Sequence, residues 1–461
     1  MRILLVNPII RSAYQSISDL GLGYLATALK KANHKVDILD CVNKRLTLEQ
    51  FGKYISSFDF DVVGFKIFST DLLSAKKCLQ IVKRHNPNTI TIVGGMHPSI
   101  LPQETLEYFS EADFGFRGEA EIGLPELINN LPNLDSEDKE KIPGLIWRNN
   151  GEIMSNAQTF TENLDTLGMP DWDLIDPRNY NFHTFHLTKS HMVAPLIITR
   201  GCPYHCTFCS AHAVTGKQIR AHSVDYIIDE IKYLYSRFGI KEVSFVDDNL
   251  IAARHTLEEL CHRIIKQKLK INWSSCGIKI DLLDKDILQL MERAGCYLIS
   301  VGIESGSQRI LDHMQKDLSL EIIKEKTVLI KNTTNIKVMT SFILGYPLEE
   351  EIDIRKTIKF ARSLPLFAAA FYGFHPIPGT PIYKELITKG EIEKEINCDS
   401  YGQDRKPYVP KNITSKKFLL LYRWAYISFY ARPKILFNIF KEINSFEKIK
   451  FLFNRLVGRF F

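Results

Sequence analysis

The chain has 461 residues, of which 45% are hydrophobic and 24% charged, and 59 Lys and Arg residues against 53 Asp and Glu residues give it a net charge of +6. This composition is typical of a folded globular protein with two or three domains. So small a positive excess does not favour a nucleic-acid partner. The sequence has no run of about 18 apolar residues, so no membrane-spanning helix is predicted.

The cysteine content predicts a reduced compartment. The chain has nine cysteines, an odd number that cannot all pair within it. Residues 1–8 read as a strand and lack the charged and apolar regions of a signal peptide. We therefore expect a cytoplasmic protein, in which clustered cysteines are metal ligands more often than disulfide partners.

Residues 1–140 alternate between strand and helix patterns. Strands are predicted at 2–6, 35–40, 62–68 and 89–93, and helices at 22–32, 47–58 and 71–85, with Thr47 as the N-cap of the second helix. This alternation predicts a doubly wound, Rossmann-like parallel sheet, which binds ligands beyond the carboxyl ends of its strands. The candidate ligand contacts at those ends are Asn7, Ser69, Thr70, Gly94, Gly95, His97, Gly118 and Glu119. Ordinary turns between strands and helices explain the same residues equally well.

One motif in this region resembles a binding site for a dinucleotide cofactor such as NAD. Residues 21–26 fit the G-x-G-x-x-A pattern of a dinucleotide site, and Asp40 ends the next predicted strand. In such sites the first glycine makes the turn directly after the first strand. Here residues 7–20 intervene, which argues against NAD.

Residues 141–190 are predicted to connect two domains. A hairpin is expected around Asn149, Asn150 and Gly151, and residues 163–179 are rich in turn-forming residues. The segment lacks the Gly/Ser composition of a flexible linker, so we expect an ordered strap.

Three cysteines follow a predicted strand at 196–199. Cys202, Cys206 and Cys209 have the spacing C-x3-C-x2-C. A cubane iron–sulfur cluster normally takes four thiolates, so a loop with three leaves one iron open to another ligand. A zinc site completed by His205 or His212 is the alternative. The other cysteines, including Cys398, read as small buried hydrophobic residues.

Residues 191–390 again alternate strands and helices. Further strands are predicted at 242–246, 272–276, 298–302, 337–342 and 370–374, which gives six βα units and a partial TIM barrel. Polar or glycine residues follow these strands, among them Asp247, Asp248, Glu304, Ser305 and Gly345. Each one alone is explained equally well by helix capping, whereas together they favour a site at the barrel mouth.

The chain resembles a known family in both halves. The stretches LLVNP, GLGYLATALKKANHKVDILD, IVGGMHPSILPQETL and FRGEAE resemble the cobalamin-binding domain of B12-dependent radical S-adenosylmethionine (SAM) proteins. The stretches RGCPYHCTFCS, FVDDN, MERAGCYLISVGIESGSQRIL, FILGYP and PIPGTP are similar to the radical SAM core. The D-x-H-x-x-G motif that supplies a cobalt ligand in many B12 proteins is missing. The resemblance therefore implies base-off cobalamin. His97 is the nearest candidate for a cobalt ligand, but a position in the loop beside the cofactor is favoured.

The resemblance also implies roles for individual residues. Cys202, Cys206 and Cys209 would bind a [4Fe–4S] cluster, and Phe208 precedes the third cysteine as in the family. Glu304 and Ser305 would contact the SAM ribose, and Gly345 and Ile377 would lie near the adenine. Asp247 or Asp248 would stand where the family's Gly-Gly-Glu segment meets the methionyl amine, although this chain has Asp-Asp-Asn there.

The function implied is reductive cleavage of SAM at the cluster to a 5′-deoxyadenosyl radical, used for methyl transfer by way of cobalamin to an unactivated carbon. A cyclisation or another oxidative rearrangement without methyl transfer is the alternative, and a cobalamin- or redox-sensing binding protein is the third. The expected partners are a small-molecule or lipid-like substrate and a flavodoxin- or ferredoxin-type electron donor. Substrate choice is expected to lie in residues 181–191, 398–410 and the C-terminal tail.

Residues 391–461 are predicted to be helical. From residue 431 to the end there are seven Lys or Arg residues, two acidic residues and several phenylalanines. A basic helix with an apolar face can lie on an anionic membrane surface. It can equally pack on the barrel with its lysine side chains reaching solvent.

Overall fold

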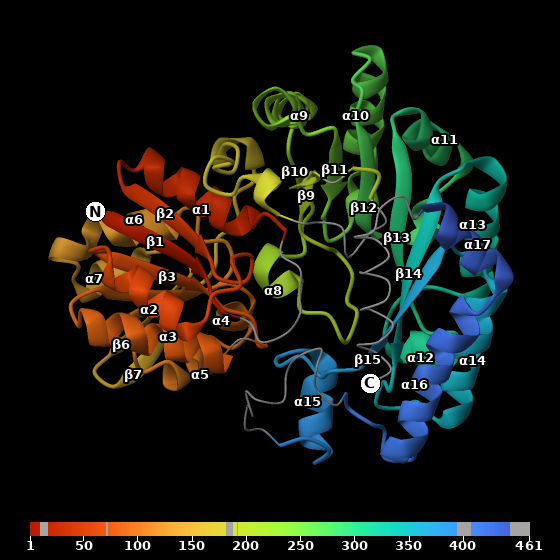
Figure 1. Cartoon of the computed structure of the whole chain (residues 1–461). Helices are drawn as coiled ribbons and strands as arrows, with labels where there is room; N and C mark the ends of the chain where they lie inside the picture. The colour runs from red at the N-terminus through yellow and green to blue at the C-terminus, as the bar shows by residue number, and fades with distance from the viewer. Residues whose placement is uncertain (10–16, 71, 181–187, 191, 394–406, 443–461) are drawn as a thin grey trace. The chain divides into compact units, whose positions relative to one another are not determined.

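The computed structural model describes residues 1–461 except 10–16, 71, 181–187, 191, 394–406 and 443–461 (Figure 1). The chain forms two compact units. The first unit comprises Met1–Tyr180, Ser210–His222 and Ile377–Arg405, and the second comprises Asn181–Cys209, Ser223–Pro376 and Lys406–Phe461. The domain boundaries expected at residues 140, 190 and 390 stay predictions.

A seven-stranded sheet in the order β2-β1-β3-β4-β5-β6-β7 forms the centre of the first unit. Its strands are β1 (Arg2–Asn7), β2 (Lys35–Asp40), β3 (Val62–Lys66), β4 (Ile90–Gly94), β5 (Phe114–Phe116), β6 (Leu145–Asn149) and β7 (Glu152–Ser155). The first five are parallel, and β6 and β7 add an antiparallel hairpin at the edge. The predicted doubly wound sheet is confirmed.

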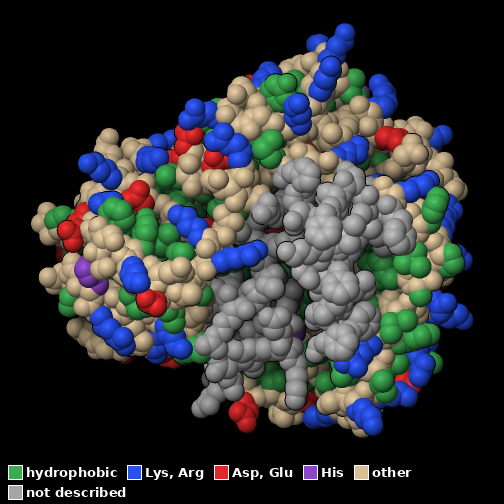
Figure 2. Space-filling model, in the orientation of Figure 1, with side chains coloured by type: hydrophobic (Ala, Val, Ile, Leu, Met, Phe, Trp, Pro, Cys, Tyr) green, Lys and Arg blue, Asp and Glu red, His purple; other side chains and the backbone are tan. Residues whose placement is uncertain are grey.

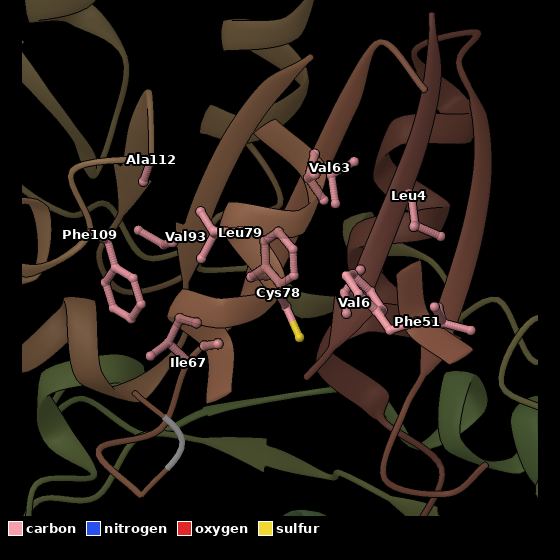
Figure 3. Packing of buried hydrophobic residues seen from close by; sticks show 14 of the residues in the cluster. Leu4, Val6, Phe51, Val63, Ile67, Cys78, Leu79, Val93, Phe109 and Ala112 are labelled. Atoms are coloured by element: carbon pink, nitrogen blue, oxygen red, sulfur yellow. The ribbon is translucent and has the colours of Figure 1, made fainter. Parts of the chain in front are cut away.

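Helices cover both faces of this sheet. They are α1 (Leu20–Lys31), α2 (Leu48–Ser56), α3 (Leu72–His85), α4 (Met96–Ile100), α5 (Pro102–Tyr108), α6 (Gly123–Asn130) and α7 (Ser136–Lys141). Successive side chains of β1 point to opposite faces of the sheet, because side chains alternate along a strand. They therefore pack in two different hydrophobic clusters, one on each face. Leu4 packs with Phe51 of α2 and Leu79 of α3 (Figure 3), whereas Ile3 packs with residues of α1 and α6.

The glycines of the supposed dinucleotide motif lie inside α1. Gly23 is a contact point for the strap, since a Cβ there would lie 2.7 Å from Ile175 Cδ1 and 2.9 Å from Pro170 Cβ. The Asp171 amide donates a hydrogen bond to the Gly23 carbonyl over 3.0 Å. Close packing of the strap therefore accounts for this glycine, and the motif lacks the strand-to-helix turn that a dinucleotide site needs.

Six parallel strands form the sheet of the second unit, in the order β8-β11-β12-β13-β14-β15. They are β8 (Ala194–Leu196), β11 (Glu242–Phe245), β12 (Asn272–Ile278), β13 (Cys296–Glu304), β14 (Lys337–Leu344) and β15 (Ala368–Gly373). The helices that connect these strands are α9 (Val224–Phe238), α10 (Arg254–Lys266), α11 (Lys285–Arg293), α12 (Gln308–His313), α13 (Leu320–Thr333) and α14 (Glu351–Ser363). Strands in chain order joined by helices confirm the predicted partial barrel.

Shorter elements complete the two units. β9 (Thr199–Arg200) leads into the cysteine loop of the second unit, and the first unit also contains α8 (His212–Thr215), β10 (Arg220–Ala221) and α15 (Pro381–Thr388).

Helix α16 (Ser415–Tyr430) lies along β15, at the end of the six-stranded sheet, and α17 (Pro433–Glu442) follows it. Tyr430 donates a hydrogen bond to the Ala369 carbonyl over 2.7 Å, and Tyr426 donates one to the Phe371 carbonyl over 2.6 Å. The Phe371 amide in turn donates to the Tyr426 hydroxyl over 3.0 Å. Within the described parts of the chain, no helix combines the length and apolarity needed to cross a membrane.

Candidate functional site

The three cysteines of the motif lie in one short loop of the second unit. Gly201 opens this loop after β9 with a φ of +101°, a conformation that favours glycine. The thiols of Cys202, Cys206 and Cys209 are reduced and partly exposed, whereas Cys41, Cys78, Cys261 and Cys296 are buried. Cys276 is also partly exposed, and Cys398 lies outside the described residues.

This loop supplies thiolate donors of the kind that bind an iron–sulfur cluster. Across the residues that the structure describes, no group of three or more His, Cys, Asp and Glu side chains could hold one metal ion. A cubane binds each thiolate at a different iron, so its ligands need not converge on one point. Three accessible thiols in one loop are the donor set that such a cluster requires.

The middle of the loop is fixed to the barrel. The Thr207 amide donates to the Met314 carbonyl over 3.0 Å, and the Thr207 hydroxyl lies 2.9 Å from the hydroxyl of Tyr346. Tyr346 is fully buried and lies 3.0 Å from Nδ1 of His313. Thr207 thus fixes the loop between Cys206 and Cys209 by hydrogen bonds to Met314, which follows α12, and Tyr346, which follows β14.

A partly buried lysine lies beside the cysteines. Lys316 Nζ is 3.1 Å from Glu304 Oε1, and the two side chains are only 16% and 9% exposed. Burial raises the pKa of the Cys202 and Cys206 thiols, and the positive charge of Lys316 opposes this rise. Burial alone would lower the pKa of Lys316, but Glu304 and the thiolates of Cys206 and Cys209 raise it overall.

Lys316 was not among the site residues predicted from the sequence. The sequence shows only that a lysine follows helix α12, a few residues after the polar residues at the end of β13. A lysine in a polar loop reads as solvated, so only the fold shows that it is partly buried.

Glu304 reaches this position through an irregular strand end. Its φ is +66°, and the pairing of β13 with β14 shifts register between Gly302 and Glu304. A Cβ on Gly302 would lie 2.2 Å from Glu304 Oε1 and 3.0 Å from Lys316 Nζ. The missing side chain at Gly302 therefore makes room for the ion pair, and the backbone strain at Glu304 is of the kind that collects at functional sites.

Ser305 is fully buried and contacts protein groups. Its hydroxyl lies 3.3 Å from that of Thr357 on α14 and accepts a hydrogen bond from the Ser307 amide over 3.2 Å. The Gly306 amide donates to the Thr357 hydroxyl over 2.9 Å. These contacts fix the turn directly after Glu304. The ribose contact of Ser305 stays a prediction.

The two aspartates after β11 differ in their surroundings. Asp247 is buried, and its Oδ1 accepts hydrogen bonds from the Ile198 amide at 2.9 Å and from the Thr199 amide and hydroxyl at 2.5 and 2.8 Å. Its Oδ2 is buried without a hydrogen-bond partner among the described residues, and burial raises its pKa to about 7. Asp248 is exposed, and its charge raises the pKa of Cys202. Asp247 thus positions the strand that enters the cysteine loop, whereas Asp248 lies toward the loop itself.

The turn after β14 depends on a buried carboxylate. Gly345 has a φ of +83°, and its amide and that of Tyr346 donate to Glu349 Oε2 over 2.6 and 3.1 Å. Burial raises the pKa of Glu349 to about 8. Ile377, the other expected adenine neighbour, belongs to the first unit, where its carbonyl accepts a hydrogen bond from the Thr380 hydroxyl. Thr380 itself is the N-cap of α15.

The expected cobalamin contacts of the first unit lie at or just after the carboxyl ends of its strands. Asn7 donates to Asp40 Oδ1 over 3.1 Å, and the Ser69 hydroxyl lies 3.0 Å from His97 Nδ1. His97 is 1% exposed, and burial lowers its pKa to about 4. The remaining members of this set are Thr70, Gly94, Gly95 and Gly118, which follow or end β3, β4 and β5.

Glu119 forms a buried ion pair within the first unit. Both of its oxygens accept hydrogen bonds from Arg220, at 2.8 and 2.6 Å, and the two side chains are 6% and 4% exposed. Arg220 also lies over the ring of Phe160, at 5.0 Å from its centroid. The contacts of Glu119 are those of a residue that holds segments of the unit together, and its contact with cobalamin stays a prediction.

Two family models match the chain. Residues 6–128 match the B12 binding domain, and residues 196–361 match the radical SAM superfamily. The chain is 30% identical over 452 residues to an uncharacterized methyltransferase of Pyrococcus horikoshii, a match that covers 97% of this chain and 96% of the relative. It is 26% identical over 332 residues to the hopanoid C-3 methylase of Methylococcus capsulatus, with 69% and 60% covered.

Solved structures share the fold. The radical SAM methyltransferase TsrM from Kitasatospora setae, with cobalamin and a [4Fe–4S] cluster bound, has a TM-score of 0.70 at 18% identity, covering 84% of this chain and 75% of that one. The cobalamin-dependent SAM radical enzyme OxsB, with cobalamin and SAM bound, has a TM-score of 0.74 at 17% identity, covering 99% and 71%. The chain therefore belongs to the cobalamin-dependent radical SAM family and is an enzyme whose cofactors are a [4Fe–4S] cluster, SAM and cobalamin.

Proposed function

We propose that this enzyme transfers a methyl group from SAM to an unactivated carbon of a small-molecule substrate. The observation that carries the proposal is the loop of three reduced thiols beside the Glu304–Lys316 pair. Relatives named as methyltransferases or methylases support this outcome. When bound, the cluster and SAM supply a 5′-deoxyadenosyl radical, and cobalamin supplies a carrier for the methyl group.

The chain's own residues would hold and orient these groups. Cys202, Cys206 and Cys209 would bind three irons and leave one for SAM. Lys316 presents a positive charge next to the thiols, where the SAM carboxylate needs a counter-charge, and Glu304 presents an acceptor for the ribose hydroxyls. Asp248 is the exposed carboxylate that suits the methionyl ammonium.

In the first unit we propose that His97 stays neutral near a bound cobalamin. Burial disfavours its charged form, and Ser69 holds its Nδ1. A neutral imidazole held in one orientation would present an uncharged ring to the cofactor, with its Nδ1 directed toward Ser69. Gly94 leaves room for a large planar ligand to approach the backbone, because the nearest atoms to a Cβ there, in Phe116, are 4.0 Å away.

Two partners complete the proposal. The cluster needs an electron donor of the flavodoxin or ferredoxin type, because SAM cleavage consumes one electron for each radical formed. We also propose that the enzyme works as a peripheral protein at a membrane surface through its basic C-terminal region, which suits a lipid-like substrate such as the one for which the hopanoid methylase is named.

The test is anaerobic reconstitution followed by turnover with reductant and SAM carrying a deuterated methyl group. Formation of 5′-deoxyadenosine together with a deuterium-labelled product supports methyl transfer. 5′-Deoxyadenosine with a product that carries no label contradicts it. That second result favours cyclisation, the activity for which a relative from Rubrivivax gelatinosus, 26% identical over 401 residues, is named.

A further inference from the structure

The two C-terminal helices expose a group of large apolar side chains, which we call the C-terminal apolar face. Its members and their exposed fractions are Leu419 47%, Leu420 55%, Trp424 48%, Ile427 45%, Leu436 42% and Phe437 60%. Leu420, Trp424 and Ile427 follow one another at spacings of four and three residues, which place them on one side of α16. Large apolar side chains exposed together on neighbouring helices are typical of an interaction site.

Helix α16 cannot turn this face inward. Its other side is buried through Phe418, Leu421, Ala425, Tyr426 and Phe429. The hydroxyls of Tyr422, Tyr426 and Tyr430 all donate to backbone carbonyls of β15, at 3.0, 2.6 and 2.7 Å. The barrel therefore holds α16 in one orientation, with the apolar face directed away from β15.

Basic residues outnumber acidic ones in the two helices that carry the apolar face. Residues 411–442 include seven Lys or Arg residues and one acidic residue, Glu442. Lys417 pairs with Glu351 of α14 over 3.1 Å, and Lys441 lies 4.4 Å from the ring centroid of Phe437. In Figure 2, hydrophobic side chains lie beside Lys and Arg side chains at the right of the surface, where Figure 1 draws α16 and α17.

We propose that the C-terminal apolar face docks on an anionic lipid surface. Apolar side chains flanked by basic ones, with a tryptophan among them, match a bilayer interface, where rings and aliphatic groups enter the headgroup boundary and ammonium groups meet lipid phosphates. The face begins at Leu419, twelve residues before the basic tail that the sequence indicates. This inference deepens the peripheral location in the proposed function, but vesicle binding requires neither cluster nor SAM and stands apart from methyl transfer.

Tryptophan fluorescence offers a specific probe. Trp147, Trp172 and Trp273 are 2%, 1% and 1% exposed, whereas Trp424 is 48% exposed. Full-length protein is mixed with vesicles of phosphatidylglycerol and phosphatidylcholine, or of phosphatidylcholine alone. With anionic vesicles we expect co-sedimentation, a blue shift of the emission and protection from acrylamide, all weakened by salt.

A paired variant and its control locate the contact. In the double variant Leu420→Glu with Ile427→Glu we expect vesicle affinity to fall by about tenfold or more, because two interfacial apolar groups become charged. Val328→Glu, on the exposed side of α13, is the control and should bind like the wild type. Circular dichroism and thermal melts verify that each variant is folded.

Four results overturn the proposal. The wild type fails to sediment with anionic vesicles, or the double variant binds as well as the wild type. Alternatively, removal of residues 443–461 abolishes binding while the double variant keeps it, which assigns the contact to the tail. Lastly, sedimentation velocity without lipid shows a dimer that the double variant loses, which makes a second copy of the chain the occupant.

Discussion

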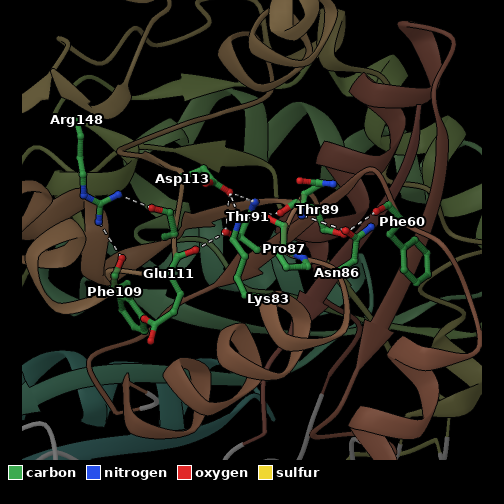
Figure 4. Close-up of polar contacts among 12 residues, drawn as sticks. Phe60, Lys83, Asn86, Pro87, Thr89, Thr91, Phe109, Glu111, Asp113 and Arg148 are labelled. Atoms are coloured by element: carbon green, nitrogen blue, oxygen red, sulfur yellow. Dashed lines mark hydrogen bonds and ion pairs between the residues drawn. The ribbon is translucent and has the colours of Figure 1, made fainter. Parts of the chain in front are cut away.

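Polar side chains gather at the amino end of β4 and around the carboxyl end of β13. Both groups lie at the end of a parallel sheet covered by helices. They differ in how many of their polar atoms have a hydrogen-bond partner. Near β4, Asp113 accepts hydrogen bonds from Lys83, the Thr91 amide and the Thr91 hydroxyl at 2.7, 2.7 and 3.0 Å (Figure 4). Arg148 donates to the carbonyls of Leu106, Phe109 and Ala112 close by.

At the carboxyl ends of β11, β13 and β14 the pairing is incomplete. Oδ2 of Asp247 and Oε1 of Glu349 are buried without a hydrogen-bond partner among the described residues, and Glu304 has a strained backbone. Buried polar groups are normally satisfied, so exceptions call for an explanation. Hydrogen bonds to all the polar side chains at β4 stabilise the fold. At the barrel mouth, buried polar atoms without a hydrogen-bond partner and carboxylates with shifted pKa values are typical of a site that binds a ligand.

The largest expected effect comes from the cysteine loop. Cys206→Ala should abolish cluster assembly, because two thiolates cannot hold the cubane. Iron and sulfide content and the optical spectrum of anaerobically reconstituted protein measure this. Cys276→Ala, which removes another partly exposed thiol, is the matched control and should retain the cluster. A full complement of iron and sulfide in Cys206→Ala would refute the ligand assignment.

Lys316→Met tests the charge beside the loop. We expect SAM binding to weaken about ten- to a hundredfold, since a hydrogen bond to a charged group contributes about 1.5–3 kcal/mol and each factor of ten is about 1.4 kcal/mol. Cluster content should stay unchanged. The measurement is the SAM-induced change in the EPR spectrum of the reduced cluster, and Lys316→Arg should restore part of it. Unchanged SAM affinity in Lys316→Met would make the lysine purely structural.

Asp113→Ala tests the opposite end of the comparison. The change leaves Lys83 and Thr91 without their shared acceptor, and should lower the free energy of unfolding by about 1–3 kcal/mol. Urea denaturation measures this, and SAM binding should be unaffected. Asp229→Ala, at an exposed ion pair of α9, should cost less than about 1 kcal/mol. Equal costs at both positions would remove the distinction between a paired network and an ordinary surface charge.

The last prediction concerns pH. The folded-state pKa of Glu349 is raised from 4.5 to about 8, so the folded protein holds a proton that the unfolded chain releases. Stability should therefore fall as pH rises from about 5 to 8. Glu349→Gln keeps an acceptor for the Gly345 and Tyr346 amides and should flatten this slope. The urea midpoint at several pH values measures it. An equal slope in both proteins would show that Glu349 is already ionised in the folded state.

Local patterns made much of this molecule predictable. The alternation of strands and helices indicated both sheets, and Thr47 was recognisable as an N-cap because the capping box with Gln50 lies within four residues. The three cysteines were found because they share one loop. Each of these signals depends on neighbours in the sequence.

Contacts between distant segments left no such signal. Glu119 and Arg220 are 101 residues apart, and each alone reads as a surface charge. The place of Lys316 beside Cys206, and the space that Gly302 leaves for Glu304, follow from how β13 and α12 return to the cysteine loop. Such pairings are determined by packing, so a single sequence does not reveal them.

The tyrosines of α16 have a consequence for the handling of this protein. A half-open barrel ends in a strand whose free amides and carbonyls could recruit a strand from another molecule. Tyr422, Tyr426 and Tyr430 occupy carbonyls of that strand with side-chain hydroxyls. Shortened versions of the chain should therefore stop after Tyr430, since a cut before this helix would leave a bare β15 open to polymerisation from one molecule to the next.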